Sequence, residues 1–298
     1  MNKELLKIDF DSFWPNFQKQ DNYFFNLLNQ KYNVVIDEHS PDLLFLSYDY
    51  SGMNNHDKYI NKDCKKIFYT GENYFPENNF YDYTFTFRET NANNIRLPLW
   101  VMHINWFNRK YSKRRDIGYH INLEKLLDEN FVNLPNKNFC SFVSSQPKGK
   151  RVDFVPEISN YKNVDCGGRL YNNTKLIKGR GDQKWKYSFL SKYRFNIAFE
   201  NTIGEGYVTE KIIQPMSENS IPIYWGSDYV KSDFNSDSII YADDFENDEH
   251  LIEYILELEN NQRLYLEKLN NPWFKNNKIS DCFLPDYYLK IFSETILN

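Results

Sequence analysis

The chain has 298 residues, of which 41% are hydrophobic and 18% aromatic, and its formal net charge is -5. A chain of this length can bury a sizeable core, and we expect two domains of ordinary size. The acidic balance argues against nucleic-acid binding, because phosphate contacts need a basic surface and the densest basic run is only "KRRD" at 113–116. Four scattered cysteines without a C-x-x-C pair indicate neither a disulfide framework nor a zinc site.

The beginning of the chain, "MNKELLKIDFDSFW", contains no apolar run of signal-peptide length. No other stretch approaches the ~18 uncharged apolar residues of a spanning helix. We therefore expect a soluble chain without an integral membrane segment or a visible secretion signal, cytoplasmic or otherwise soluble in a microbial or viral context.

The first half of the sequence alternates short apolar runs with helical patterns. The predicted strands are "LLKIDF", "YNVVIDE", "DLLFLSYDY" and "KKIFYTGEN", and a helix is predicted through "FFNLLNQKY". Such alternation is typical of a parallel sheet covered by helices. From Val101 onward the pattern weakens, and we expect a loop followed by a short helix at "NLEKLLDE".

A second alternation follows a boundary near residues 133–137. It contains "KNFCSFVSS", the helical "KRVDFVPEISNY", "VDCGGRL", "FNIAFE", "IPIYWG" and "IIYADDF". The stretch "DEHLIEYILELENNQRLYLEKLNN" has helical spacing and ends before Pro272. We predict an α/β fold with two lobes, residues 1–137 and 138–272, and an aromatic tail, 273–298, that packs back on the first lobe.

The segment from Arg194 to Gly226 carries the densest chemistry in the second lobe. Glu200 and Asn201 follow a buried strand and therefore emerge at its carboxyl end, where open α/β sheets bind ligands. After a Gly-Glu-Gly turn, a helix is predicted to begin near Thr209. Lys211 would suit a phosphate and Glu210 a pair of vicinal sugar hydroxyls, as in a sugar nucleotide, although an ordinary capped helix has the same pattern.

At this point the sequence resembles a known family. "FNIAFENTIGEGYVTEKI…IPIYWG" and "VDCGGRL" look like the signature of the α-1,3-fucosyltransferases. "PDLLFLSYDY", "IFYTGENYFP", "DYTFTF" and "RLPLW" resemble the amino-terminal blocks of the same family in the same order, so the likeness runs from about Ile8 to Phe245. The segment "RETNANNIRLPLW" lacks the acidic-aromatic pattern of several members, which puts the acceptor contacts in doubt.

The resemblance implies the GT-B arrangement, in which two Rossmann-like domains face each other across a cleft. It implies an inverting glycosyltransferase that moves L-fucose from GDP-fucose to a GlcNAc or N-acetyllactosamine type hydroxyl of a glycan. The first domain would bind this acceptor and the second the GDP-sugar, without an obligatory metal or other cofactor. Asp9-Phe10-Asp11 has the spacing of a metal-binding D-x-D, but we interpret it as a pair of strand-end acids.

The resemblance also implies roles for individual residues. Glu72 in "TGEN" matches the proposed general base, and such a base must sit across the cleft from the donor. The donor-binding positions are matched by residues of the second lobe: Arg151, Asn201, Tyr207, Glu210 and Lys211. Glu200 is added to the donor-binding set, either as a direct contact to fucose or as an acid that orients Lys211 or Arg194.

Three other interpretations stay open. The first is a transferase of the same family that uses another GDP-sugar or linkage. The second is a non-catalytic glycan- or nucleotide-binding protein, which would have no need of an acceptor-side base such as Glu72. The third is a structural protein with an aromatic interaction surface, which predicts no GDP binding at all.

Overall fold

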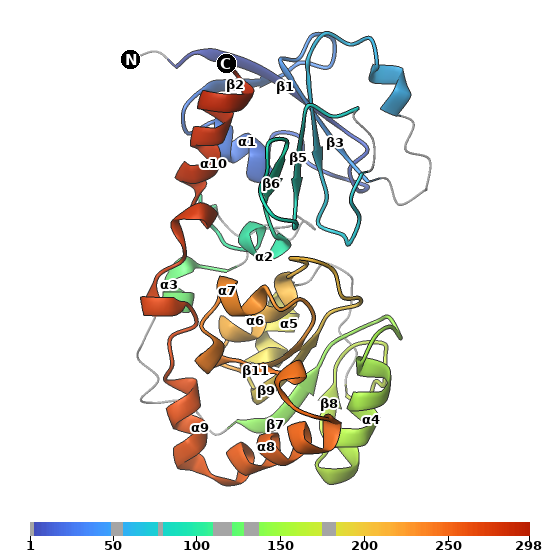
Figure 1. The fold of residues 1–298 in the computed structure, drawn as a ribbon, viewed down its shortest axis with the longest axis vertical. Coiled ribbons are helices and arrows are strands. Elements are labelled where there is room, and N and C mark those ends of the chain that lie inside the picture. The colour runs from blue at the N-terminus through green and yellow to red at the C-terminus, as the bar shows by residue number, and fades with distance from the viewer. Residues whose placement is uncertain (1–2, 49–55, 77–79, 110–120, 128–136, 175–182) are drawn as a thin grey trace.

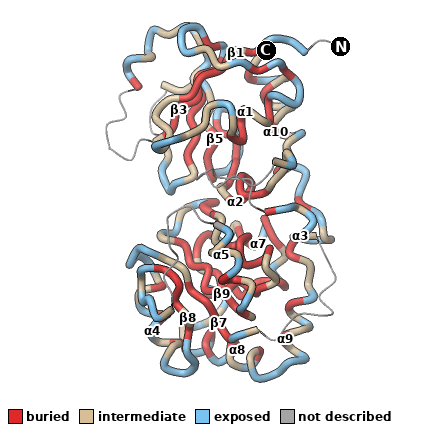
Figure 2. Tube along the Cα trace, turned by 180° about the vertical axis from the view of Figure 1, so that it is seen from behind, coloured by how far each residue is buried: buried red, intermediate tan, exposed pale blue. Residues whose placement is uncertain are grey.

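The protein consists of two lobes stacked along its longest axis, each built around one parallel sheet (Figure 1). The computed structural model describes residues 3–48, 56–76, 80–109, 121–127, 137–174 and 183–298. The basic run at 113–116 and residues 133–136 of the predicted boundary lie outside these ranges. Figure 2 shows that the buried residues follow the strands through the middle of each lobe.

The N-terminal sheet has the strand order β2-β1-β3-β4-β5-β6, and every neighbouring pair is parallel. All five residues of β3 are buried, as expected where both faces of a parallel sheet are covered. The bounds in chain order are β1 Leu5–Asp11, β2 Asn33–Ile36, β3 Leu43–Ser47, β4 Lys65–Tyr69, β5 Tyr83–Thr86 and β6 Asn94–Arg96.

The C-terminal sheet has the order β11-β10-β9-β7-β8 and is also parallel throughout. Because all its strands point the same way, their carboxyl ends share one edge, where the loops toward the helices begin. The bounds are β7 Asn138–Phe142, β8 Val164–Cys166, β9 Tyr193–Phe199, β10 Ile221–Trp225 and β11 Ile240–Tyr241.

Helices cover both sheets, and α2 lies between the lobes, where it contacts α6 (Figure 1). None of the helices in the described chain has the length and apolarity needed to span a bilayer. Their bounds are α1 Tyr23–Leu28, α2 Leu99–Met102, α3 Leu123–Leu127, α4 Arg151–Tyr161, α5 Gln183–Leu190, α6 Glu210–Met216, α7 Val230–Asp233, α8 Asp248–Asn260, α9 Gln262–Leu269 and α10 Pro285–Ile291.

The end of the chain returns from the C-terminal lobe to the N-terminal lobe. Figure 1 shows α10 running alongside the N-terminal sheet. The Tyr288 hydroxyl donates to the Arg96 carbonyl oxygen at 3.0 Å, and the Phe292 ring stacks on Phe85 with centroids 5.3 Å apart. The first lobe therefore has residues from both ends of the chain in its core.

The long helical stretch predicted before Pro272 is two helices, not one. Asn261 has extended dihedral angles, φ -118° and ψ 96°, and separates α8 from α9. Its side-chain oxygen accepts from the Leu264 amide at 3.2 Å and so caps α9. Asparagine favours this position because its short side chain satisfies an amide that the first turn leaves free.

Candidate functional site

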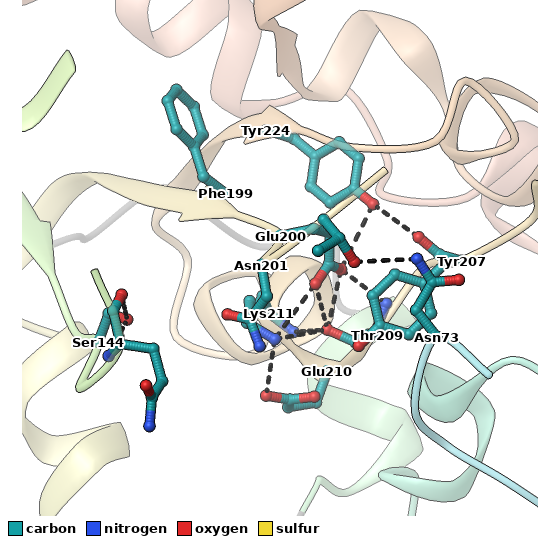
Figure 3. Close-up of polar contacts among 12 residues, drawn as sticks. Asn73, Ser144, Phe199, Glu200, Asn201, Tyr207, Thr209, Glu210, Lys211 and Tyr224 are labelled. Carbon is teal, nitrogen blue, oxygen red and sulfur yellow. Dashed lines mark hydrogen bonds and ion pairs between the residues drawn. The ribbon is translucent and has the colours of Figure 1, made fainter. Parts of the chain in front are cut away.

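A polar cluster occupies the carboxyl end of the C-terminal sheet (Figure 3). β9 ends at Phe199 and delivers Glu200 and Asn201, while β10 brings Tyr224 to the same edge. As predicted, α6 begins next to them with Thr209 as its N-cap and Glu210 as its first residue. The ends of β9 and β10 and the start of α6 thus bring these polar residues to the same place.

Glu200 is the most deeply buried acid of the cluster, with none of its surface exposed. Its carboxylate accepts from the Thr209 amide and hydroxyl, both at 2.8 Å, and lies 3.2 Å from the Lys211 Nζ. The Tyr224 hydroxyl donates to it at 3.4 Å. Burial raises the pKa of Glu200, and Lys211 opposes this shift. These contacts fix the Lys211 ammonium at the start of α6.

Lys211 lies between two carboxylates. Its Nζ is 3.5 Å from Glu210 as well as 3.2 Å from Glu200, and it donates to the Thr209 hydroxyl at 3.0 Å. Burial disfavours the charged ammonium, but the two carboxylates outweigh it and raise the pKa of Lys211. Burial also opposes the charge on Glu210, yet Lys211 leads the interactions that hold the pKa of this carboxyl well below its usual range. Both groups are therefore ionised at neutral pH.

Arg151 begins α4 and only 1% of its surface is exposed. Its Nη1 donates to Ser144 Oγ and to Asn201 Oδ1, each at 2.8 Å, and its Nη2 donates to the Phe199 carbonyl. Burial lowers the pKa of the guanidinium, although an arginine of this kind keeps its proton. The arrangement orients Asn201 and places a cation beside the end of β9.

The loop after Asn201 contacts the opposite lobe through Asn73. The Asn73 amide donates to Thr202 Oγ1 at 2.9 Å and to the Ile203 carbonyl at 3.2 Å (Figure 3). A Cβ at Gly204 would lie 2.4 Å from Asn73 Oδ1, so any side chain at this position would displace the Asn73 amide. The predicted Gly-Glu-Gly turn therefore serves a contact between the lobes.

Gly206 closes the same turn against the N-terminal lobe. Its φ is +69°, and a Cβ would lie 2.1 Å from the Phe87 carbonyl oxygen. Tyr207 follows with 4% of its surface exposed, and its ring meets the Phe87 ring edge-on at 5.2 Å. Tyr207 thus packs between the lobes, while its carbonyl accepts from Tyr224 at 3.5 Å.

Glu72 lies in the N-terminal lobe, in the turn after β4, and is exposed. Its amide donates to Thr70 Oγ1 at 3.1 Å, and the next residue is Asn73, which makes the contact described above. The structure therefore brings Arg151, Glu200, Asn201, Glu210 and Lys211 together in one lobe. It places Glu72 on the other lobe, one residue from an interlobe hydrogen bond.

A buried ion pair joins the lobes at a second point. The Arg96 guanidinium donates to both carboxylate oxygens of Asp233, each at 2.9 Å, and Trp100 Nε1 donates to the same carboxylate at 3.0 Å. Arg96 also donates to the Phe87 carbonyl at 3.0 Å. Burial raises the pKa of Asp233, and Arg96 opposes this shift.

The sequence interpretation did not identify several residues of the site, namely Asn73, Ser144, Thr209 as a ligand of Glu200, and Lys186. Lys186 lies on α5 and lines a small cavity together with Arg151 and Lys211. The sequence predicted Thr209 near the N-cap of a helix. Asn73, Ser144 and Lys186 reach the cluster only through the tertiary structure, which the sequence pattern does not reveal.

Asp9 and Asp11 lie at the end of β1, as predicted for strand-end acids. Asp9 pairs with Lys19 at 2.7 Å and Asp11 with Lys58 at 2.7 Å. In the part of the chain that the structure describes, no group of three or more His, Cys, Asp or Glu residues could hold a metal ion.

Two lobes, each built around a parallel sheet, with a charged cluster at the carboxyl end of the second sheet, form the GT-B arrangement that the resemblance implied. The model of the glycosyltransferase family 10 (fucosyltransferase) C-terminal domain matches residues 133–287. The model of the alpha-(1,3)-fucosyltransferase FucT N-terminal domain matches residues 8–103. The chain belongs to glycosyltransferase family 10, and the family and fold predicted from the sequence are confirmed.

The chain is similar to the alpha-(1,3)-fucosyltransferase FucT of Helicobacter pylori, with 31% identity over 90% of this chain and 60% of that protein. It is 29% identical to the GDP-fucose protein O-fucosyltransferase 3 of Xenopus tropicalis over 47% of this chain and 33% of that one. The chain thus spans less than two thirds of the length of these relatives. A crystal structure of an alpha1,3-fucosyltransferase with GDP-fucose superposes with a TM-score of 0.73 and 28% identity, covering 100% of this chain and 92% of that one.

Proposed function

We propose that the protein is an inverting α-1,3-fucosyltransferase that moves L-fucose from GDP-fucose to a GlcNAc-type hydroxyl of a glycan. Membership of glycosyltransferase family 10 supports this reaction class. The observation that carries the proposal is the convergence of Arg151 and Lys211 at the carboxyl edge of the C-terminal sheet. The interlobe contact of Asn73 lies beside them and supports the placement of Glu72 opposite the donor.

On the donor side, Arg151 and Lys211 stabilise the negative charge that develops on the departing GDP. Because these two cations supply the charge that a divalent ion would otherwise provide, the proposal includes no obligatory metal. Glu210 accepts hydrogen bonds from hydroxyls of the donor, and Asn201 and Tyr207 complete its contacts. Glu200 serves this site through Lys211, whose ammonium its buried carboxylate holds.

On the acceptor side, Glu72 acts as the general base. The acceptor oxygen forms a bond to the anomeric carbon of fucose while the bond from that carbon to the GDP oxygen breaks. The acceptor proton passes to the Glu72 carboxylate, and the attack from the opposite face inverts the anomeric carbon. The exposed position of Glu72 leaves room for an acceptor sugar beside it.

Two alternatives concern the substrates. The same site would accept another GDP-sugar or form another linkage if its sugar contacts differ from those of its relatives. The similarity to a GDP-fucose protein O-fucosyltransferase supports a protein hydroxyl as a second candidate acceptor. A non-catalytic binding protein would keep GDP affinity without turnover.

The test is incubation with GDP-fucose, with and without a chelator, followed by mass and linkage analysis. The acceptor panel contains GlcNAc, N-acetyllactosamine, lactose and a Ser/Thr peptide. We expect an α-1,3-fucosylated GlcNAc-type product whose yield is insensitive to the chelator. A fucosylated peptide alone would favour the second acceptor, and transfer from only another GDP-sugar would change the donor. GDP binding without any transfer would favour the binding protein.

Glu72→Gln is expected to lower kcat by about 10²–10⁴-fold, the usual contribution of a positioned base. GDP affinity is expected to change less than about twofold, because Glu72 lies on the lobe opposite the cluster. Steady-state transfer rates and GDP titration measure the two quantities. Glu38→Gln, which removes an exposed carboxylate on the same lobe, is the control. Equal rates in both variants would contradict the role of Glu72.

A further inference from the structure

Three cationic side chains from three different helices line one small cavity at the carboxyl edge of the C-terminal sheet. Arg151 comes from α4, Lys186 from α5 and Lys211 from α6. Ser144, shortly after the end of β7, and Phe199, the last residue of β9, line the same cavity. Lys186 belongs to none of the motifs that led to the proposed function, so its presence beside the other two cations needs a separate explanation.

The acids of this cluster are already matched to Lys211. Glu200 and Glu210 lie 3.2 and 3.5 Å from its Nζ. Neither Arg151 nor Lys186 forms an ion pair with a carboxylate in the described chain. Three cations therefore face two acids, and the surplus positive charge lies in a largely buried place.

Arg151 itself has donor capacity left over. Its two terminal nitrogens donate to neutral oxygens, and its Nε, although buried, has no hydrogen-bond partner among the described residues. A buried donor or cation without a counter-charge is costly to folding. Such an arrangement is typical of a site whose anion comes from a ligand.

We propose that Lys186 is a third cationic contact to the diphosphate of the nucleotide donor, in addition to Arg151 and Lys211, and that it takes up a proton when the diphosphate binds. This inference rests on the proposed function, because it assumes that a nucleoside diphosphate binds at this edge. A nucleoside without phosphates would gain nothing from this lysine.

The charges around Lys186 support proton uptake. Burial is the main cause that lowers the pKa of Lys186, Glu210 and Glu200 act in the opposite direction, Lys211 adds to the lowering, and the net result is a pKa of about 8. Arg151 is the remaining charged group that lines the cavity. A bound diphosphate favours the ammonium and raises this pKa, so affinity weakens as pH rises through about 8.

The test is calorimetric titration of the protein with GDP at pH 8 in two buffers with different ionisation enthalpies. The difference between the two apparent enthalpies, divided by the difference between the ionisation enthalpies of the buffers, gives the number of protons taken up. Because the pKa of Lys186 lies near this pH, part of the free protein carries a neutral Lys186, and a net uptake of protons, less than one per GDP, is expected. The terminal phosphate of GDP titrates near pH 6 and contributes little at pH 8.

Lys186→Met is expected to bind GDP about tenfold more weakly or worse and to lose the proton uptake. Lys186→Arg, which stays charged at this pH, is expected to keep most of the affinity and also to lose the uptake. Affinity for guanosine should be equal in all three proteins. The matched control is Lys184→Met, on an exposed position of the same helix, which should behave as the wild type in both respects.

The possible outcomes separate the two proposals. If Lys186→Met binds GDP with the affinity and proton uptake of the wild type, the role of Lys186 is overturned while the donor site stands. Equal weakening of guanosine binding and of GDP binding in Lys186→Met would also overturn the role of Lys186, because the lysine would then act on the base or on folding. If the wild type binds no GDP, the proposed function itself fails.

Discussion

Arg151 stands in the segment "PKGKR", whose composition is that of a solvated loop. In the structure it is buried because α4 begins at this residue and directs the side chain onto the end of β9. Composition alone does not distinguish a solvated arginine from a buried one. The likeness to the family predicts a functional role for Arg151, and the following variant tests it.

Arg151→Lys is expected to lower GDP affinity at least about tenfold, because an ammonium cannot replace the planar fork that reaches Ser144, Asn201 and Phe199 together. The melting temperature should also fall, since these partners lose their donor. GDP titration and thermal unfolding measure the two effects. Arg263→Lys, an exposed pair with Glu267, is the control and should change neither. Unchanged GDP affinity in Arg151→Lys would contradict the proposal that Arg151 binds the donor.

At the scale of elements, the sequence predicted the buried strands best. β3 and β10 are nearly continuous apolar runs, as expected in sheets covered on both faces, and β1, β4, β7 and β9 are mainly apolar with a few polar residues among them. The interpretation did not identify β5 and β6 as strands, because their interior carries polar residues. Asn94 on β6 accepts from Thr84 and Thr86 on β5, so side-chain hydrogen bonds join these two short strands.

The break between α8 and α9 escaped prediction for a different reason. The apolar spacing continues through Asn261, and a single extended residue leaves the periodicity almost unchanged. Lys186 could not be assigned either, because its role depends on how α5 lies relative to α4 and α6. For Lys186, what the sequence lacked was information on contacts between elements.

We predict different effects of alanine at the two ends of the turn from Gly204 to Gly206. In Gly204→Ala the new Cβ is expected to displace the Asn73 amide, which is the mobile end of a side chain, so stability falls little while transfer activity falls. In Gly206→Ala the Cβ meets the Phe87 backbone at a positive φ, so both stability and activity fall. Thermal unfolding and transfer rates give the comparison.

Asn73→Ala is the companion variant, because it removes the interlobe hydrogen bonds without adding strain. It is expected to reproduce the activity loss of Gly204→Ala and to leave the melting temperature nearly unchanged. Full activity in Asn73→Ala would show that the contact between this turn and the loop after Asn201 does not position the reacting groups.

At the scale of the whole molecule, the Arg96–Asp233 pair ties the two lobes together. Asp233→Asn leaves the Arg96 guanidinium buried without its counter-charge, and the free energy of unfolding is expected to fall by about 3–5 kcal/mol. Asp244→Asn breaks an exposed pair with Lys231 and should cost less than about 1 kcal/mol. Urea unfolding monitored in both lobes tests this, and equal losses in the two variants would contradict it.

The return of α10 to the N-terminal lobe also has a consequence for synthesis. Tyr288 and Phe292 leave the ribosome after every strand of both sheets, yet they complete the core around Phe85. The first lobe to be translated is therefore the last to be finished, and its core must stay open while the second lobe forms. Nascent chains arrested before residue 285 should hold a protease-resistant C-terminal lobe next to an N-terminal lobe that is still cleaved.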